Sequence, residues 1–566
     1  MLYKKGETMK KLIALLCAAL LLLLTGCGGA KTTKAVKPYS STIDTGTDDP
    51  IDDPAGDETE RPYELSGGDD IMYSFSDEDD SSATTVLVEK GTAPATLDTP
   101  WRNMTYAPVA LGGAEETAQK MRLDVINSEN TDKYYTWTGK TYYVSPDGDD
   151  EKNDGLSPNR PIKTLDADIF LTNPTKPGDA ILFERDGVWR MTNGIRPREG
   201  VIYGSYGTGQ KPTFYGSAAN YADEKYWLAT KKANIWKITV MDPDIGLVVF
   251  NHGELVGCKK FNGLTVLEKN GDYYFSPKND TLYLYFDKGN PGKYFKDIEI
   301  GLTKVAFTVG KNGVIVDNLR IKYFAKGGIY SGSCVEDFTV TNCELGFIGG
   351  AVHHDVVRLG NCIQNWNTTF RVLVRNNWMY QAFDTGYTFQ GDDRNGPGFD
   401  DEGNPRIGDN VYYQDITVRD NIIEYCEYAI EFWHSEQSDS IPILANIINF
   451  DLSDNAFRYS GYSWSCVQRH DNAGYNIYVG NRYFKNARDS KISNNIFDLS
   501  SRSEVYWGFQ NPQGGFDIYG NTFYQAKNQR NEGMWFGKSR NSYDQSTLET
   551  AVSVFDSNPR KVLWLQ

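Results

Sequence analysis

Alternation of apolar and polar residues is the dominant pattern in the stretch 371–434. One face of two predicted strands is formed by Phe383, Thr385, Tyr387 and Phe389 and by Cys426, Tyr428, Ile430 and Phe432. Successive side chains of a strand point to opposite faces, so we expect these residues to lie in the interior. The intervening residues should face solvent, namely Asp384, Gly386 and Thr388 in the first strand and Glu427, Ala429, Glu431 and Trp433 in the second.

The two strands belong to a repeat marked by asparagine. An Asn precedes an apolar pair at Asn318, Asn342, Asn377, Asn421, Asn446, Asn495 and Asn521. The intervals of 24, 25 and 26 residues recur, and the longer ones are explained by inserted loops or by two units. A period of this size indicates a stacked solenoid of β-strands with one coil per repeat. The Asn is expected to take the left-handed corner and to bond the Asn of the next coil.

The chain around this repeat divides into several predicted segments. The solenoid is expected over 141–540, and residues 217–300 interrupt the period with short strands of their own, which predicts an inserted β subdomain. The region 86–140 contains a helical pattern at 114–128 and is predicted to cap the N-terminal end of the solenoid. The region 541–566 is predicted to close the other end, with Asp544 or Ser546 capping a helix.

The segment 141–165, TYYVSPDGDDEKNDGLSPNRPIKTL, resembles the opening motif of right-handed parallel β-helix proteins of the pectate-lyase-like superfamily. The NIWKITV and GDYYFSPKNDTLYLYF stretches of the insertion resemble the insertion of β-helix glycoside hydrolases. The resemblance implies an all-β, right-handed parallel β-helix that acts on carbohydrate.

The first 30 residues resemble a bacterial lipoprotein signal peptide. Basic residues precede an apolar run that ends in Leu24-Thr25-Gly26-Cys27, the pattern of a lipobox. The resemblance implies cleavage before Cys27, a lipid on its sulfur, and an extracytoplasmic protein anchored to a bacterial membrane. A plain secretory signal or a short anchor helix is the alternative. Residues 31–85 are polar and acidic, so they are expected to form an extended disordered tether.

Charge and cysteine content narrow the choice of partners. The net charge is −17, and residues 44–80 contribute most of it with 15 acidic residues and one Arg. Nucleic acid is therefore not an expected partner. Six of the eight Cys lie beyond the signal segment without metal-ligand spacing, which indicates buried free thiols or a disulfide such as Cys334–Cys343.

The candidate chemistry lies on the outward positions. If Tyr387 is level with Ile430, an offset of 43 residues, then Asp384 stacks on Glu427 and Thr388 stacks on Glu431. Carboxylates on neighbouring strands would be about 5 Å apart, the separation found in retaining glycosidases. An offset of 44, set by the Asn residues, would instead pair Asp384 with Tyr428 and break the alternation. We therefore expect an offset of 43, with one residue absorbed in the corner. A solvated acidic surface without catalysis is the structural alternative.

Further outward residues are candidates for binding a sugar. Gln364 and Trp366 lie one coil before Thr388 and Gln390, and Trp433 and His434 end the second strand. Arg358 lies in an extra segment of an earlier coil, expected near the site, and Glu431 shares the outer face. Aromatic faces and polar groups of this kind bind sugar rings and hydroxyls.

The sequence therefore predicts a cell-surface enzyme that hydrolyses a polysaccharide or oligosaccharide with Asp384 and Glu427. The alternatives are a calcium-dependent polysaccharide lyase of the same fold and a non-catalytic glycan-binding lipoprotein. Hydrolysis by two carboxylates needs no cofactor, whereas a lyase would use calcium. A solenoid closed at both ends needs no partner subunit, so we expect a monomer.

Overall fold

The computed structural model describes residues 85–90, 113–167, 174–332, 334–353, 357–391, 411–434, 445–464, 474–480, 487–508, 513–527, 535–536 and 544–565. The predicted signal segment with Cys27, the tether and the loop 392–410 lie outside these residues.

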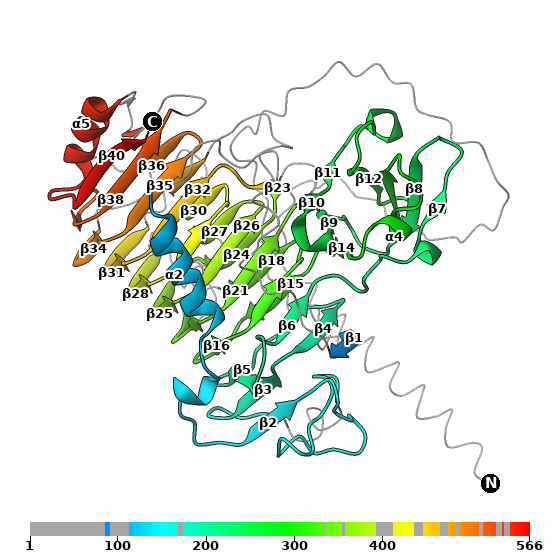
Figure 1. Cartoon of the computed structure of the whole chain (residues 1–566). Helices are drawn as coiled ribbons and strands as arrows, with labels where there is room; N and C mark the ends of the chain where they lie inside the picture. The colour runs from blue at the N-terminus through cyan, green and yellow to red at the C-terminus, as the bar shows by residue number, and fades with distance from the viewer. Residues whose placement is uncertain are drawn as a thin grey trace, which may run out of the picture. The chain divides into compact units, whose positions relative to one another are not determined.

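Three long sheets wind around one apolar interior (Figure 1). Sheet 1 has the order β1 (Thr85–Lys90), β4 (Gly187–Met191), β6 (Thr213–Tyr215), β17 (Arg320–Lys322), β21 (Glu344–Ile348), β26 (Trp378–Ala382), β29 (Ile422–Glu424), β32 (Ala456–Ser460), β35 (Ile496–Ser500), β38 (Thr522–Ala526) and β40 (Lys561–Leu565). Sheet 2 has the order β2 (Thr141–Val144), β3 (Ala180–Glu184), β5 (Ile202–Tyr206), β16 (Ile315–Asp317), β20 (Thr339–Thr341), β25 (Thr369–Arg375), β28 (Tyr412–Arg419), β31 (Asn446–Ser453), β34 (Ser490–Ser493) and β37 (Phe516–Tyr519), with β19 (Val335–Glu336) beside β25. Sheet 3 has the order β15 (Val305–Val309), β18 (Gly327–Ser331), β24 (Asn361–Trp366), β27 (Thr385–Gly391), β30 (Tyr428–His434), β33 (Tyr475–Val479), β36 (Ser503–Trp507) and β39 (Trp535–Phe536).

The connectivity is that of a parallel β-helix, as the sequence predicts. From β16 to β39, each coil contributes a strand to sheet 2, then to sheet 1, then to sheet 3, as in β16, β17 and β18. Neighbouring coils pair in parallel, and the exception in the described part of these sheets is β1, which runs antiparallel to β4. Apolar residues from all three sheets meet in one continuous buried cluster along the solenoid. Burial of these side chains is the main stabilising term of such a fold.

The predicted asparagine ladder runs through the corner between sheets 2 and 1. The side-chain amide of Asn377 donates to Oδ1 of Asn421 at 3.0 Å, and that of Asn421 donates to Oδ1 of Asn455 at 2.9 Å. The ladder continues through Asn495 and Asn521 and ends on Asp556. Each of these buried amides is therefore paired, which removes the cost of burying it.

The structure corrects two details of this prediction. The left-handed backbone belongs to the residue before the ladder Asn, for example Asn376 before Asn377. Asn318 and Asn342 hold this left-handed position, with φ of 59° and 55°, so they are not rungs of the same kind as Asn377. Asn446 lies within β31, and the rung after Asn421 is Asn455, which the repeat search missed.

The predicted inward and outward positions hold for most of β27 and β30. Tyr387, Phe389, Ile430 and Phe432 are buried in the solenoid interior. Thr385 and Tyr428 do not face inward as predicted, because the Thr385 hydroxyl bonds Glu431 and the Tyr428 ring joins an aromatic cluster outside that interior. Phe383 was also predicted to face inward, but it packs against Trp464 in a separate cluster. Ala429 packs inside, and a Cβ at Gly386 would lie 2.3 Å from Cγ2 of the core residue Ile423. These exceptions lie just after the corners that follow β26 and β29, where strict strand alternation does not yet apply. The outward residues Asp384, Thr388, Glu427 and Glu431 are buried and do not face solvent as predicted.

Residues between β6 and β15 form the inserted β structure. One sheet contains β11 (Cys258–Lys259), β12 (Asp272–Ser276), β13 (Thr281–Tyr285), β8 (Ile235–Thr239) and β7 (Leu228–Ala229), and a second contains β10 (Leu255–Val256), β9 (Leu247–Phe250) and β14 (Ile298–Gly301). Short helices accompany them: η3 (Glu224–Tyr226), η4 (Asn251–Gly253), η5 (Leu264–Val266) and α4 (Pro291–Tyr294). These strands enclose an apolar cluster of their own.

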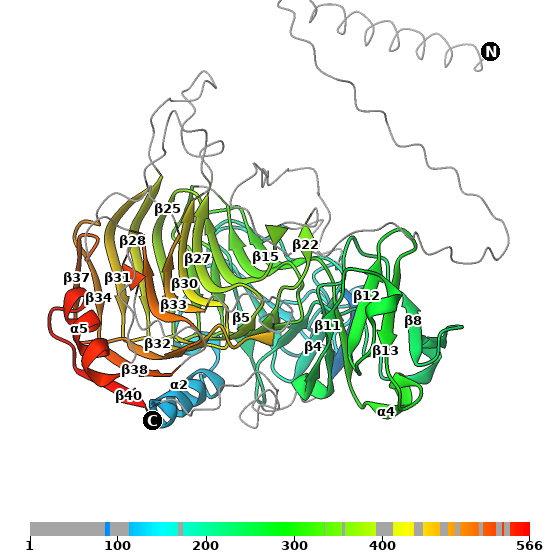
Figure 2. The same ribbon diagram turned by 90° about the horizontal axis from the view of Figure 1, so that it is seen from above.

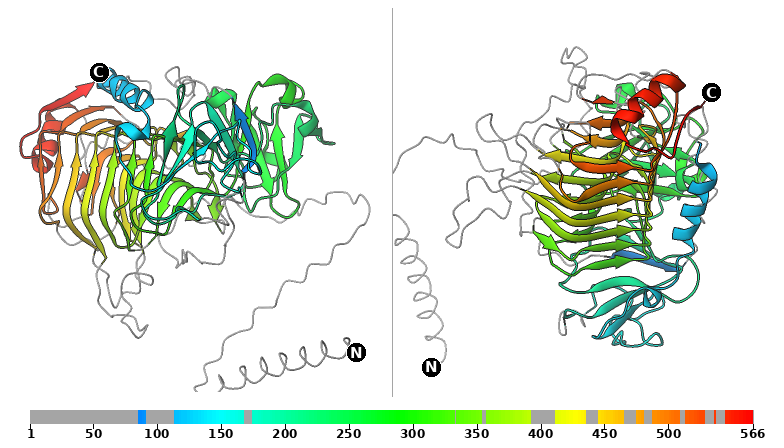
Figure 3. Two further views of the ribbon diagram at one scale, coloured as in Figure 1. Left: turned by 90° about the horizontal axis from the view of Figure 1, so that it is seen from below. Right: turned by 90° about the vertical axis from the view of Figure 1, so that its left-hand side faces the viewer.

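Helix α2 (Glu115–Ile126), which η2 (Thr131–Lys133) follows, does not cap the end of the solenoid as predicted. It crosses the outer face of sheet 1 (Figure 3), where Arg122 bonds both carboxylate oxygens of Glu424 at 2.6 and 2.7 Å. Glu424 also pairs with Arg458, which pairs with Asp498 on the next coil. Helix α2 thus supplies ion-pair partners for the buried charged residues of this face. The helical pattern in the sequence does not show where the helix packs.

Helix α5 (Gln545–Phe555) lies at the C-terminal end of the solenoid. Asp544 caps it by accepting from the Thr547 backbone N–H at 2.9 Å, as the sequence predicted for one of two candidates. Leu548, Val552 and Phe555 join the solenoid interior. The helix therefore covers apolar side chains of the last coils.

The described cysteines form no disulfide with one another, so the alternative Cys334–Cys343 pairing that the sequence left open is not formed. Cys343, Cys362 and Cys426 are buried, where Cys acts as a small apolar residue. Within the described residues, no helix is long and apolar enough to cross a membrane.

Candidate active site

The outer face of sheet 3 brings together the two predicted carboxylates. Thr385 is level with Tyr428, and Tyr387 with Ile430, so the offset is 43 residues, as predicted. Asp384 and Glu427 immediately precede these strands, and the Glu427 backbone N–H donates to the Asp384 carbonyl at 2.9 Å. The two residues are therefore neighbours on adjacent coils.

Arg358 joins the two carboxylates. Its guanidinium forms an ion pair with Asp384 at 3.3 Å and a hydrogen-bonded ion pair with Glu427. The side chains of Asp384 and Glu427 are buried, with 9% and 1% of them exposed, and that of Arg358 is half-buried, with 15% exposed. Burial by itself lowers the pKa of Arg358, but the charges of Asp384 and Glu427 outweigh it and raise that pKa. Arg358 is therefore a permanent positive charge between two buried acids.

A third carboxylate, Glu431, lies on the same face. Its Oε2 accepts hydrogen bonds from the hydroxyl of Thr388 at 2.7 Å, the amide of Gln390 at 2.7 Å and the hydroxyl of Thr385 at 3.2 Å. Burial raises the pKa of Glu431 to about 7, and the charge of Asp384 adds to the rise. Burial also raises the pKa of Asp384, which Arg358 opposes. Perturbed carboxyl groups gathered in this way are typical of catalytic sites.

The predicted binding residues lie level with the strand neighbours expected from the sequence, but some of their side chains are buried. Gln364 pairs with Thr388, Trp366 with Gln390, and Gln390 with Trp433 across neighbouring strands. Trp366 is only 2% exposed, so its ring is not open for stacking on a sugar, contrary to the prediction. Gln364 is also buried and accepts from the Asn361 amide at 2.8 Å, whereas Trp433 is half-buried. His434 ends β30 opposite Gly391, but its side chain lies outside the described part of the structure.

An aromatic ladder that the sequence analysis missed continues this face toward the C-terminal coils. Tyr428 stacks on Tyr478 with ring centroids 4.6 Å apart, and Tyr478 lies 4.9 Å from Tyr506. Tyr478 is the strand neighbour of Glu431, and Tyr506 follows it on the next coil. The sequence contains a signal for this ladder, because Tyr428 and Tyr475 occupy one register position and Tyr478 and Tyr506 another. The repeat period is irregular in this part of the chain, which hides that signal.

A small hairpin carries Arg358 to this site. It consists of β22 (Val352–His353), labelled in Figure 2, and β23 (Val357–Arg358), labelled in Figure 1, and in the chain it lies between β21 and β24. The Val352 backbone N–H donates to Asp244 at 2.9 Å, and Lys259 forms an ion pair with the same carboxylate. Asp244 and Lys259 belong to the inserted subdomain, which therefore supports the hairpin.

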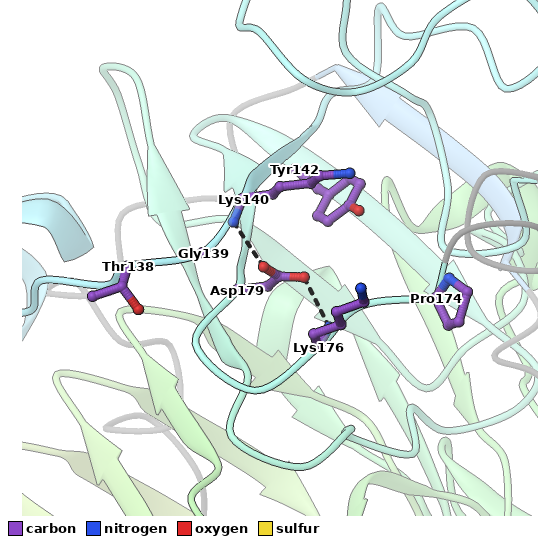
Figure 4. Close-up of a pocket in the computed structure, with 7 residues that line it drawn as sticks. All are labelled: Thr138, Gly139, Lys140, Tyr142, Pro174, Lys176 and Asp179. Carbon is purple, nitrogen blue, oxygen red and sulfur yellow. Dashed lines mark hydrogen bonds between the residues drawn. The ribbon is translucent and has the colours of Figure 1, made fainter.

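A separate pocket lies near the N-terminal end of the solenoid (Figure 4). Its lining residues are Thr138, Gly139, Lys140, Tyr142, Pro174, Lys176 and Asp179. The Asp179 carboxylate accepts from the backbone N–H groups of Lys140 and Lys176, at 2.7 and 2.8 Å. That carboxylate holds two chain segments together, so the pocket offers no acid for catalysis. In the described parts of the chain, no group of three or more His, Cys, Asp or Glu residues could hold a metal ion.

Comparisons with known proteins assign no family to the chain. No family model and no curated protein matches the sequence. A structure described as XylC with xylose is 13% identical, with a TM-score of 0.41, over 68% of this chain and 69% of that one. A structure described as a glycoside hydrolase is 9% identical, with a TM-score of 0.40, over 75% and 96%. A rhamnogalacturonan lyase is 11% identical, with a TM-score of 0.27, over 69% and 74%. At these values the likenesses carry neither a family nor an activity over to this chain.

Proposed function

We propose that this protein is a carbohydrate-active enzyme that hydrolyses glycosidic bonds at the Asp384–Arg358–Glu427 cluster. The observation that supports the proposal is the meeting of Asp384 and Glu427 across adjacent coils, bridged by Arg358. Glycoside hydrolysis by paired carboxylates needs one ionised group and one proton donor close together. Arg358 favours ionisation of the acids it contacts, and the buried surroundings retain a proton nearby.

The outer face of sheet 3 suits an extended sugar substrate. Gln390 and Trp433, which follow the acids along β27 and β30, are half-buried and polar or aromatic, and so are Tyr478 and Tyr506 of the ladder on the following coils. Hydroxyl and amide groups bond sugar hydroxyls, while the apolar bodies of tyrosines cover the rings' apolar faces. We therefore propose an oligosaccharide or polysaccharide that lies along the axis of the solenoid.

Digestion of a panel of plant and microbial polysaccharides by the full chain in detergent micelles tests this proposal. We expect release of saturated oligosaccharides, detected by mass, from at least one member. Asp384→Asn and Glu427→Gln should each abolish that release while leaving the thermal unfolding transition in place. Full activity of both variants would refute the assignment of the site.

The same experiment distinguishes the two other classes of function. Unsaturated products that absorb in the ultraviolet, and that disappear with a chelator, would identify a calcium-dependent lyase. Retention of a glycan without products, unaffected by Asp384→Asn, would identify a binding protein. Burial and nearby carboxylate charge raise the pKa of Tyr428 and Tyr478, which makes these phenols poor bases for a lyase.

We also propose that the protein is anchored outside the cytoplasm through a lipid on Cys27. The support for this is the lipobox Leu24-Thr25-Gly26-Cys27 after an apolar run. Metabolic labelling with radioactive palmitate in a bacterial host should mark the protein, and Cys27→Ala should lose the label. An unlabelled protein that is secreted in full would contradict the anchor.

A further inference from the structure

Glu431 differs from the other two acids of the cluster in how its oxygens are used. Three side chains of β27, those of Thr385, Thr388 and Gln390, all bond the same oxygen, Oε2. No hydrogen bond from the described residues reaches Oε1. An oxygen with several donors is an acceptor that carries no proton of its own, so a proton on this carboxyl group belongs on Oε1.

Charge balance favours a proton at the same place. Arg358 is the cation of the cluster, and its ion pairs within the described residues go to Asp384 and Glu427. A further buried negative charge on Glu431 would be repelled by Asp384, and within the described residues no cation is paired with Glu431. Neighbouring acids titrate together, and the acid that is not paired with a cation has the highest proton affinity.

We propose that Glu431 is the general acid and base of the site, that Asp384 is the nucleophile, and that Glu427 holds Arg358 beside it. This inference rests on the proposed hydrolase function and changes the roles expected from the sequence. In that expectation Asp384 and Glu427 formed the catalytic pair, and Glu431 only bound substrate.

The reaction balances with these roles. Oε1 of Glu431 gives its proton to the glycosidic oxygen as the bond from that oxygen to the anomeric carbon breaks, and the leaving sugar departs as an alcohol. The Asp384 carboxylate bonds the anomeric carbon. Water then attacks that carbon and gives a proton to the Glu431 carboxylate, which releases Asp384 and restores the starting state. The sum is one glycosidic bond and one water converted into two hydroxyl groups.

The first test compares leaving groups in the full chain and its Glu431→Gln variant. The probes are phenyl and 2,4-dinitrophenyl glycosides, α and β, of glucose, galactose, xylose and N-acetylglucosamine. On a phenyl glycoside, which needs a proton donor, the variant should lose about 10²- to 10⁴-fold in kcat/KM. On the 2,4-dinitrophenyl glycoside, which leaves without a proton, glycosylation should fall by less than about tenfold, and azide should accelerate turnover by replacing water. Glu116→Gln, at an exposed position of α2, is the matched control and should behave as wild type.

Equal losses on both probes without rescue by azide would overturn the inference, because a merely structural role predicts that result. Loss of the basic limb of the pH profile in Glu431→Gln would support it, since that limb reports deprotonation of the acid.

The second test does not depend on activity. Protein labelled with ¹³C at glutamate δ-carboxyl groups should show one resonance that titrates near neutral pH and is missing in Glu431→Gln. A Glu431 carboxyl that is ionised throughout this range would overturn the inference even if the protein hydrolyses glycans. If the titration is seen but no glycoside is cleaved, the hydrolase proposal fails while the placement of the proton stands.

Discussion

The Arg358 Nη2 and Asp384 Oδ1 atoms lie 3.3 Å apart, although the two residues belong to adjacent coils. Asp384 follows the corner after β26, whereas Arg358 ends the hairpin inserted before β24. The ion pair makes the β22–β23 hairpin part of the candidate active site. Movement of this hairpin would change the distance from Arg358 to the two acids and therefore their pKa values.

Replacing Arg358 should damage both stability and activity. Arg358→Met removes the positive charge between Asp384 and Glu427 and leaves buried acids without a partner, which costs about 3–5 kcal/mol where such pairs have been broken. Urea unfolding measures the loss. Arg371→Met provides the control, because Arg371 pairs with Glu336 and Asp337 on the surface and its removal should leave the transition unchanged.

The asparagine ladder should be a major source of stability. Asn421→Ala leaves the side-chain amide and backbone N–H of Asn377 without their acceptor and the Val374 carbonyl without its donor. Buried groups left unbonded in this way cost about 1–3 kcal/mol each, so denaturant unfolding should show a loss at the upper end of that range or above. Asn446→Ala, at a sequence-predicted rung outside the ladder, should cost clearly less.

Acid should destabilise the protein through Glu344 on sheet 1. Burial alone would raise its pKa, but Arg320 and Lys322 outweigh burial and lower the pKa of Glu344 to about 2, from about 4.5 in an unfolded chain. The unfolded state binds the proton first, so this contribution is complete above about pH 4.5 and is lost as pH falls toward 2. Thermal unfolding across this range should show a smaller acid dependence in Glu344→Gln. An unchanged slope would contradict the ion network.

Glu431 should have the opposite pH dependence. Its pKa is raised to about 7, so the folded state retains a proton that the unfolded state has lost. Its contribution is complete below about pH 4.5 and declines as pH rises through 7. Glu431→Gln should therefore gain stability relative to wild type between pH 5 and 8, measured as the difference in unfolding temperature. A difference that stays constant over this range would mean that Glu431 is ionised throughout.

Asp244 should affect catalysis without touching the carboxylate cluster. Asp244→Asn loses the ion pair with Lys259 and weakens the bond to Val352 that supports the hairpin. We expect lower kcat, because Arg358 would be held less firmly, and also a loss of stability, because the buried Lys259 loses its Asp244 partner. Lys232→Met, an exposed change in the same subdomain, is the control. Unaltered kcat in Asp244→Asn would show that the hairpin is positioned by other contacts.

The sequence by itself determined the solenoid, its repeat and the offset of 43 residues that brings Asp384 next to Glu427. These are local properties, since strand alternation and coil length are written in consecutive residues. Only the tertiary structure shows the features that depend on long-range contacts. These are the position of Arg358 between the two acids, the hydrogen bonds of Glu431 to β27, the burial of Trp366, and the path of α2 across the coils. Each depends on atoms far apart in the chain, so no pattern within one repeat could reveal it.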